Sequence, residues 1–566
     1  MNIHKGLPTV PITYDTIVSL DIEIFGQTKG KLHRPTGTFA CLSVGIGDDV
    51  FVIQDTADLP TLFDMLVPAK HLVFHQSLYD IRQLRRWMKF DRRSVWDTLL
   101  VDKILWGGYF NIHEFSLEDL ARRYLDVRLE KDTRKQFEGS TYMTEEMIEY
   151  AAKDAFYTLR IQEAQQREID TRQYDMNTYW MIDEPAIWAV LDLQPAKVDV
   201  PQWLSMAKEF ERRGIEMERE LGVNVYSHQQ VKEFVRKHTG IKLENTAAET
   251  LEESKSESVE AATLIDKITL IRMLRKASST YGYKWIEENV EEDGLVYSDF
   301  YVIGAESGRM VSSNPNLQQI PSRRIPEYRQ LFISRHGKMV VSDIQAQEPR
   351  ILAYLSQDKK LREAFDNKED VHLSVTRAIF DDPTIQKSDK RREVGKMINL
   401  ATSYGLTAQG LASRLGIPLE KAESFLRQYF ARFSGVVAYI DKMRSIANRF
   451  EYVETISGRR VWINRHNFQA QNNAINAPIQ GSGADMLKLW MVDFWEWCKN
   501  EHLPYPVTMP IHDELVMDVP IETAPKYRTG ITEALHSAAG KLFHGMPFEV
   551  EIHQGRTWAC KKETEE

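Results

Sequence analysis

Five side chains in the first third of the chain have types and spacings that suit metal-assisted hydrolysis. Asp21 and Glu23 stand two apart in an apolar β-rich run, which places both carboxylates on one face of a strand. Asp80 follows another apolar run, and Tyr150 and Asp154 are four apart in an Ala-rich helical segment. Each motif alone is more often a solvated pair or a helix-start acid. Together they offer the hard oxygen ligands that two Mg²⁺ or Mn²⁺ ions require, with a phenol to orient water.

Further acids stand at the ends of apolar strands in the second half of the chain. Asp343 closes the run that begins at Met339, and residues 506–520 alternate apolar side chains around the tip His512-Asp513-Glu514, which predicts a β-hairpin. An Asp after a strand is more often a turn former or a helix cap. The apolar flanks would bury the hairpin tip, however, and a buried carboxylate is costly unless a metal ion or a cation compensates.

A third group is cationic. Arg392, Lys396 and Tyr404 stand at multiples of four, so they share one face of a helix. A solvated basic helix is one interpretation. The other is a triphosphate site, in which two cations hold the phosphates and the base stacks on the ring, while Gly405 lets the chain turn.

The elements that would position these residues fall into three regions. Residues 16–54 are typical of strands, and a helix with Thr144 as its N-cap follows them, so an α/β unit is expected to end at about residue 185. Residues 195–289 are helical and charged, which predicts a projecting helical element, with a capping-box signature at Thr246 and Glu249. From Gly294 onward short strands and long helices mix. At about 150 residues per domain, the 566 residues predict three or four structural units.

The composition narrows the class of protein. Apolar residues make up 43% of the chain and charged residues 27%, without an apolar run that could span a membrane. The cysteines Cys41, Cys498 and Cys560 show no metal-site or disulfide spacing, so we expect a reducing, cytoplasmic location. The net charge of −10 does not exclude a polyanionic partner, because basic residues gather locally, as at 390–392.

The first constellation resembles the DnaQ-like 3′→5′ exonuclease superfamily, which includes proofreading domains and ribonuclease D. The order DxE, then an Asp after a strand, then YxxxD carries the resemblance. It implies a ribonuclease H-like fold and a water-positioning role for Tyr150. It also implies four metal ligands: Asp21, Glu23, Asp80 and Asp154. Gln76 stands where the family often has Asn, so contact with the terminal nucleotide is expected to differ.

The remainder resembles family A DNA polymerases. Five motifs follow in the family's order: SGRMVSSNPNLQQIPSR at 307–323, VSDIQAQEPR at 341–350, RREVGKMINLATSYG at 391–405, NAPIQGSGADMLK at 476–488 and IHDELVMDVP at 511–520. Several are long, and with the exonuclease the resemblance covers nearly the whole chain.

This second resemblance implies a right-hand polymerase and a role for each matching residue. Asp343 and Asp513 would hold two Mg²⁺ ions, with Glu514 nearby. Glu348 would be a steric gate against a ribose 2′-hydroxyl, and Tyr404 would lie beside the templating base. The triphosphate would be held by Arg392, Lys396 and His372, with Leu400 beside the sugar, and DNA would be contacted by Arg309, Asn476, Gln480 and His512.

The expected fold is therefore a multidomain α/β protein in which a ribonuclease H-like exonuclease precedes the polymerase. We expect the exonuclease at about 1–185 and the polymerase at about 186–566, with a thumb near 195–290, palm and fingers near 294–566, and fingers near 357–450. The expected partners are primer–template DNA and dNTPs, with two Mg²⁺ per site, replaceable by Mn²⁺. Replisome proteins such as a helicase, primase, single-strand-binding protein or processivity factor are not readable from the residues. The absence of a preceding 5′-nuclease favours a compact, phage-type replicative polymerase.

Three residues depart from the usual polymerase motifs, and three alternative functions stay open. Leu400 stands where the family usually has Phe or Tyr, Ala346 replaces a usual Gln, and Asn472 replaces a usual Arg. These departures put sugar discrimination and some DNA contacts in doubt. A single-subunit RNA polymerase would lack the exonuclease and a bulky acid at Glu348. A ribonuclease D-like nuclease explains only the first third, and a non-catalytic nucleic-acid scaffold would tolerate loss of the carboxylates.

Overall fold

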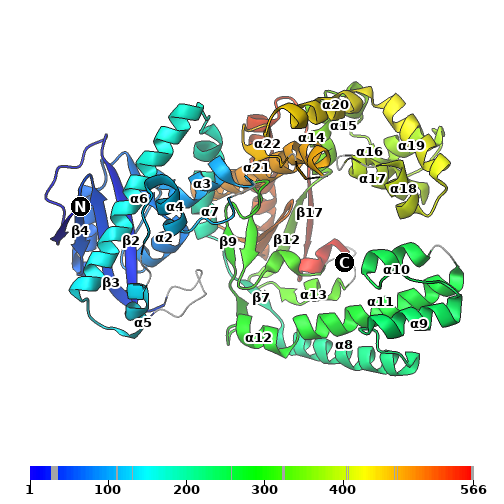
Figure 1. Ribbon diagram of the computed structural model, residues 1–566, viewed down its shortest axis with the longest axis horizontal. Coiled ribbons are helices and arrows are strands. Elements are labelled where there is room, and N and C mark those ends of the chain that lie inside the picture. The colour runs from blue at the N-terminus through cyan, green and yellow to red at the C-terminus, as the bar shows by residue number, and fades with distance from the viewer. Residues whose placement is uncertain are drawn as a thin grey trace.

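The structure is a computed structural model of the chain, and it describes residues 1–26, 36–109, 112–129, 132–255, 258–321, 325–402, 405, 407–464, 466–467 and 469–562. Figure 1 shows an α/β unit at the left and a central sheet with long helices beside it. At the right, one group of helices lies above and another below.

The left-hand unit is built on a six-stranded mixed sheet. The strand order is β1-β4-β3-β2-β5-β6, in which β2 runs antiparallel to β3 and parallel to β5. Along β2, Ile22 and Ile24 are buried whereas Asp21 and Glu23 are half-buried, because successive side chains point to opposite faces. The two acids thus share a face, as predicted. The strands are β1 (Asn2–Lys5), β2 (Ile17–Phe25), β3 (Thr38–Ile46), β4 (Asp49–Ile53), β5 (His71–Phe74) and β6 (Val95–Asp97).

Helix α6 (Glu145–Arg172) packs on β2, β3 and β4 through small residues. Ala151, Ala152 and Ala155 are buried with no more than a methyl group each, so the helix lies close to the sheet. The hydroxyl of Thr144 accepts a hydrogen bond from the Met147 backbone N–H at 3.2 Å, which confirms the predicted N-cap. The other helices of this unit are α1 (Leu59–Met65), α2 (Ser77–Leu84), α3 (Thr98–Trp106), α4 (Leu117–Leu125), α5 (Gln136–Gly139) and α7 (Glu184–Leu191).

A four-stranded antiparallel sheet of order β15-β16-β12-β17 lies at the centre of the molecule (Figure 1). Strands β15 (Val507–Ile511) and β16 (Glu514–Pro520) form the predicted hairpin, and β16 pairs with β12 (Gly337–Ile344), which pairs in turn with β17 (Val550–Gly555). All of β15 and all but the last residue of β16 are buried. Helix α22 (Ala524–Leu542) packs on this sheet and on α21 (Ala470–Asn500).

The lower helices form an arm that begins and ends at neighbouring strands of one small sheet. Strand β7 (Ala196–Val198) pairs antiparallel with β8 (Leu295–Val296), and the whole arm lies between them in the sequence. Its outer part has a separate apolar core that includes Val231, Leu251 and Ile265. The arm consists of α8 (Val200–Leu221), α9 (His228–Thr239), α10 (Ala248–Ser254), α11 (Val259–Thr280) and α12 (Tyr283–Asn289).

The capping box expected at Thr246 is wrong. Helix α10 begins at Ala248 with Ala247 at the N-cap and no side-chain cap. The Thr246 hydroxyl instead contacts a ring nitrogen of His228 at 2.5 Å and accepts a bond from Arg272 at 3.2 Å. These long-range partners outweigh the local capping preference.

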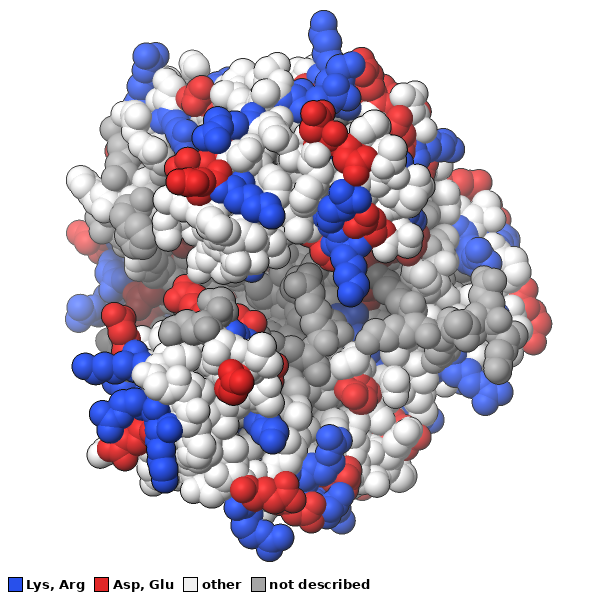
Figure 2. Space-filling model, turned by 90° about the vertical axis from the view of Figure 1, so that its right-hand side faces the viewer, with Lys and Arg blue, Asp and Glu red and all other residues white. Residues whose placement is uncertain are grey.

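The upper helices follow the central strand β12 in the chain. They are α14 (Gln347–Ser356), α15 (Lys359–Asp366), α16 (Val371–Phe380), α17 (Arg391–Thr402), α18 (Ala408–Leu415), α19 (Leu419–Arg432) and α20 (Ser434–Arg449). Figure 2 shows that the face they share with the arm is hollowed between the two, with charged side chains of both signs on either side. Within the described ranges, no helix is both long and apolar enough to cross a membrane.

Smaller elements complete the chain. A β-ribbon of β9 (Asp299–Tyr301) and β10 (Val311–Ser313) precedes α13 (Glu327–Gln330) and β11 (Phe332–Ile333), which pairs with β7. A second ribbon joins β13 (Tyr452–Glu454) to β14 (Arg460–Trp462), and a π-helical turn spans Tyr179–Asp183. Short 3-10 helices span Thr56–Asp58, Asp132–Lys135, Leu317–Gln319, Ile521–Thr523 and Trp558–Lys562.

Candidate active sites

The first candidate site joins β2 to α6. Ligand oxygens of Asp21, Glu23 and Asp154 all lie within 4.8 Å of one another, and all three residues are half-buried. The buried Ser19 hydroxyl donates a hydrogen bond to the Ala155 carbonyl at 2.6 Å, which fixes α6 over β2 beside Asp154. Three carboxylates this close repel one another, so the arrangement suits a divalent cation with oxygen ligands.

Asp80 adjoins this trio without being part of it. Its side chain lies in the first turn of α2, and Oδ1 accepts a hydrogen bond from the Ile22 backbone N–H at 3.1 Å, between Asp21 and Glu23. Burial, and secondarily the charge of Asp21, raises the pKa of Asp80 well above its usual range. Tyr150 is on α6 one turn before Asp154, with its ring 6.1 Å from that of Phe137. The five predicted residues therefore come from three elements: Asp21 and Glu23 from β2, Tyr150 and Asp154 from α6, and Asp80 from α2, which reaches the backbone of β2 at Ile22.

Sequence reasoning missed the residue that shapes the turn before Asp80. Asp97, at the end of β6, accepts hydrogen bonds from the backbone N–H of Gln76 at 3.2 Å and of Ser77 at 2.8 Å, and it also caps α3. Gln76 has φ +67°, a left-handed conformation that this bond supports. The signal in the sequence was an acid directly before the helical run at Thr98.

The second candidate site is a cavity of about 710 Å³ above the central sheet. Asp343 and Glu514 are cross-strand partners, and the Ile344 backbone N–H donates to the Asp513 carbonyl at 3.1 Å. Asp343, next to the last residue of β12, and Asp513, in the turn before β16, are therefore close to one another, and both line the cavity. Among the predicted residues, the others that line it are Glu348, His372, Arg392, Lys396, Leu400, Arg309 and His512.

The cationic wall of the cavity comes from α16 and α17. The guanidinium of Arg392 donates to Asp370 Oδ2 from Nη2 at 2.7 Å and from Nε at 3.0 Å. Asp370 also caps α16 through the Leu373 backbone N–H. Sequence reasoning did not single out Asp370. Its carboxylate holds the guanidinium of Arg392, on α17, at the N-terminus of α16.

His372 is neutral and has a defined tautomer. Burial lowers the pKa of His372 to about 4, so the ring is uncharged at neutral pH. Its Nδ1 lies 3.3 Å from the amide nitrogen of Asn399, whose oxygen lies 3.4 Å from the Tyr429 hydroxyl. Because that amide nitrogen is a donor, Nδ1 accepts and Nε2 carries the proton. Asn399 is a further residue that sequence reasoning missed.

The hairpin tip and α14 supply the remaining wall. Arg309 Nη2 lies 3.5 Å from Glu348 Oε1. His512 at the tip has φ +57°, and burial, then the charges of Arg309 and Arg329, lowers its pKa. Ala346, before α14, has φ +49°, an uncommon conformation for a residue with a Cβ.

Three predicted residues do not line the cavity, and a fourth is not described by the structure. Glu514 is buried and is not among the cavity-lining residues; its Oε1 accepts a hydrogen bond from Trp558 Nε1 at 2.6 Å and lies 3.6 Å from Arg329. Asn476 and Gln480 are on α21 and are not among the cavity-lining residues. Tyr404 lies outside the described residues. The roles expected of these four stay predictions.

A further acid reaches the cavity from β17. Glu551 is the cross-strand partner of Asp343 on the side opposite Glu514. Its Oε1 lies 2.9 Å from Nε2 of His553. Residues directly opposite on neighbouring strands point to the same face, so β17 adds a carboxylate beside Asp343. The alternation of Glu549, Val550, Glu551 and Ile552 was the available signal.

Known families match the two parts of the chain that hold the two candidate sites. The family described as DNA polymerase family A matches residues 202–560, and a family described as 3′-5′ exonuclease matches residues 17–170. DNA polymerase I of Pseudomonas aeruginosa is 29% identical over 522 residues, which cover 87% of this chain and 56% of that protein. Thermostable DNA polymerase I of Thermus aquaticus is 30% identical over 413 residues, which cover 68% of this chain and 48% of that protein. The chain thus spans about half the length of these curated relatives.

A solved structure gives the same fold. The POL domain of Pol1 from M. smegmatis, in complex with DNA primer-template and dNTP, superposes with a TM-score of 0.82 over 97% of each chain at 24% identity. Both expected resemblances and the expected fold class are confirmed. Because the polymerase family matches more than half of the residues, the chain belongs to DNA polymerase family A, with a 3′-5′ exonuclease domain before its polymerase domain.

Proposed function

We propose that the protein synthesises DNA from dNTPs on a primer–template and removes mispaired nucleotides from the primer end by 3′→5′ hydrolysis. One observation carries the proposal: Asp343 and Asp513 share a cavity of about 710 Å³ with the cationic residues of α16 and α17. Carboxylates on one wall and cations on the other suit a triphosphate that is held at one end and attacked at the other.

Each wall has a task in nucleotidyl transfer. Arg392 and Lys396 neutralise the triphosphate, and His372 donates its Nε2–H to a phosphate oxygen, as its contact with Asn399 favours. The primer 3′-oxygen attacks the α-phosphorus in line, and the bond to pyrophosphate breaks. Glu348 closes the side on which a ribose 2′-hydroxyl would enter, and Leu400 is beside the sugar.

The acids fit divalent metal ions. Asp343 and Asp513 would hold two Mg²⁺ ions, or Mn²⁺ in their place, since carboxylate oxygens are the ligands these cations prefer. Bound Mg²⁺ supplies electrostatic stabilisation of the charge on the attacking and leaving oxygens. Glu514, which contacts Trp558, would position Asp343 across the strand pair.

The hydrolytic site rests on the trio within 4.8 Å. Asp21, Glu23 and Asp154 would be ligands to a divalent cation, with Asp80 completing the site for a second one. Tyr150 would orient the attacking water. Gln76, in its left-handed conformation, would replace an Asn in contact with the terminal nucleotide.

The assignment of domains follows from these roles. We propose an exonuclease over about 1–185 and a polymerase over about 186–566, with the arm as thumb, the central sheet as palm and helices α15 to α20 as fingers. Within the polymerase, the residues proposed to contact DNA are Arg309, Asn476, Gln480 and His512. A role in replication is part of the proposal, because one chain would both extend a primer and correct it.

Primer extension with matched and mismatched 3′ ends tests the proposal. The protein should extend a matched primer with dNTPs and Mg²⁺, reject rNTPs, and shorten a mismatched primer before extending it. Equal use of rNTPs would favour an RNA polymerase, and degradation without extension would favour a nuclease. If both activities persist after EDTA is added, both proposed metal sites are contradicted.

A further inference from the structure

The loop that carries Arg309 is held by residues of the exonuclease side. The chain leaves β9 at Tyr301 and reaches Arg309 at the cavity wall within a few residues. On the way, the Ile303 carbonyl accepts a hydrogen bond from Lys103 Nζ at 2.7 Å. Lys103 is on α3, inside the segment that matches the exonuclease family. A Cβ on Gly108, just after α3, would lie 3.1 Å from the Glu306 side chain, so this end of α3 also packs on the loop.

The loop is internally closed, so its two ends cannot move independently. The backbone N–H groups of Gly304 and Ala305 both donate to the Arg309 carbonyl, at 2.9 and 3.2 Å, and the Gly308 N–H donates to Ala305 at 2.9 Å. Gly308 has φ +81°, a conformation that favours glycine. A shift of Ile303 is therefore transmitted to Arg309 through one turn of hydrogen-bonded backbone.

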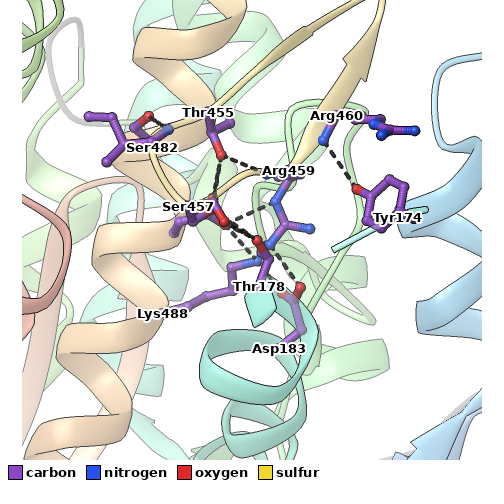
Figure 3. Close-up of polar contacts among 11 residues, drawn as sticks. Tyr174, Thr178, Asp183, Thr455, Ser457, Arg459, Arg460, Ser482 and Lys488 are labelled. Carbon is purple, nitrogen blue, oxygen red and sulfur yellow. Dashed lines mark hydrogen bonds and ion pairs between the residues drawn. The ribbon is translucent and has the colours of Figure 1, made fainter. Parts of the chain in front are cut away.

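The other side of the loop rests on a buried guanidinium. A Cβ on Gly308 would lie 2.6 Å from Nε of Arg459, so loop and guanidinium are in direct contact. Arg459 is almost fully buried, and its Nη2 lies 2.8 Å from Asp183 and 2.6 Å from Asp485. Lys488 contacts both acids, as Figure 3 shows for Asp183.

This charge network also joins the two parts of the chain. Asp183 closes the π-helical turn that follows the exonuclease segment, whereas Arg459 precedes β14 and Asp485 is on α21. The Thr178 hydroxyl donates to the Ser457 carbonyl at 2.5 Å (Figure 3). Two cations and two carboxylates compensate one another. Removing one member of such a buried charge network is costly, so the network that supports Gly308 is rigid.

From these contacts we propose that Lys103 is a positioning residue for Arg309, and that the loop of residues 303–309 couples the exonuclease domain to the polymerase cavity. Lys103 holds the outer end of the loop while Arg459 holds its inner side. Displacement of the exonuclease domain would therefore shift Arg309 relative to Glu348 and His512. The inference rests on the proposed polymerase function, since Arg309 matters only if the cavity takes a nucleotide and a primer end.

The test uses Lys103→Met in the full-length protein, which keeps the aliphatic stem and removes the donor. We expect kcat/KM for a correct dNTP to fall about fivefold to tenfold, which is the effect of losing one hydrogen bond of ordinary strength, while hydrolysis of single-stranded DNA stays within about twofold. Lys89→Met is the matched control: Lys89 is an exposed lysine of the same domain whose contact is with nearby Asp91, and extension should not change. In Gly308→Ala, the added methyl group would clash with Arg459 and displace the loop. This variant should likewise lose primer extension and keep hydrolysis of single-stranded DNA.

A double-mutant cycle separates positioning from a general structural role. In an Arg309→Ala background, Lys103→Met should cause no further loss of extension, because the residue that it positions is gone. An equal loss in both backgrounds, or unchanged extension in Lys103→Met and Gly308→Ala, would overturn the inference. Failure of the wild-type protein to extend any primer would instead overturn the proposed function.

Discussion

Replacing Asp154 by Asn should stabilise the metal-free protein while removing its response to metal. The ligand oxygens of Asp21, Glu23 and Asp154 lie within 4.8 Å of one another. Two unit charges at that separation repel by about 3.5 kcal/mol at an effective dielectric constant of 20. Because the three residues are half-buried, solvent screening reduces this, and we expect a gain of about 1–2 kcal/mol when one charge is removed.

The assay is thermal unfolding in EDTA and in excess Mn²⁺. For a unit of this size 1 kcal/mol corresponds to about 2–4 °C, so Asp154→Asn should raise the transition of the exonuclease domain by about 2–8 °C in EDTA. In the wild type, Mn²⁺ at about 100 times its Kd should add about 2.7 kcal/mol, and the variant should gain much less. Hydrolysis of single-stranded DNA should be lost in the variant.

The control has the same charge change without the neighbouring acids. Asp64 is an exposed residue of α1 in the same domain, and Asp64→Asn should alter neither the EDTA transition nor the Mn²⁺ response. A lower transition for Asp154→Asn in EDTA would refute the repulsion. An Mn²⁺ response equal to that of the wild type would refute the metal site.

Three further outcomes are expected. Asp513→Asn should reduce primer extension about a thousandfold or more with DNA binding retained, whereas Glu514→Gln, which can still accept from Trp558, should reduce it far less; equal losses would contradict the buried, indirect position of Glu514. Asn399→Leu should raise KM for dNTP about fivefold with little change in kcat, because the Nε2–H tautomer of His372 loses its support; steady-state kinetics with an unchanged KM would disprove this. Burial lowers the pKa of His75 to about 4, below the unfolded value of about 6.5, so the folded state binds fewer protons and up to about 3 kcal/mol of stability is lost as pH falls from about 6.5 to 4. In His75→Gln, urea unfolding across that range should depend less on pH, and an identical pH slope would rule out the assignment.

Motifs on single elements were predictable from the sequence. The shared face of Asp21 and Glu23 follows from strand alternation, and the hairpin at Asp513 follows from its apolar flanks. The N-cap at Thr144 needs only local chemistry. In each case the interactions that decide the structure lie within a few residues, so local patterns contain them.

Contacts between distant segments were not predictable in this way. Thr246 has every local mark of an N-cap, yet its hydroxyl contacts His228 and Arg272 from other helices. Likewise, nothing in the spacing of Lys103 indicates its hydrogen bond to Ile303 in the loop before Arg309, and nothing in the spacing of Asp183 indicates its ion pair with Arg459. Such pairings depend on how the domains pack, and a single sequence holds no direct record of that packing.

The arm of helices α8 to α12 has a consequence for engineering. Its ends, β7 and β8, are neighbours in one small sheet, and its outer part has its own apolar core. Exchanging residues between Val225 and Ile271 for a longer or shorter module would leave the spacing of β12, β16 and β17 unchanged. With the arm as the proposed thumb, its contact with DNA could then be redesigned separately from the proposed chemistry of bond formation.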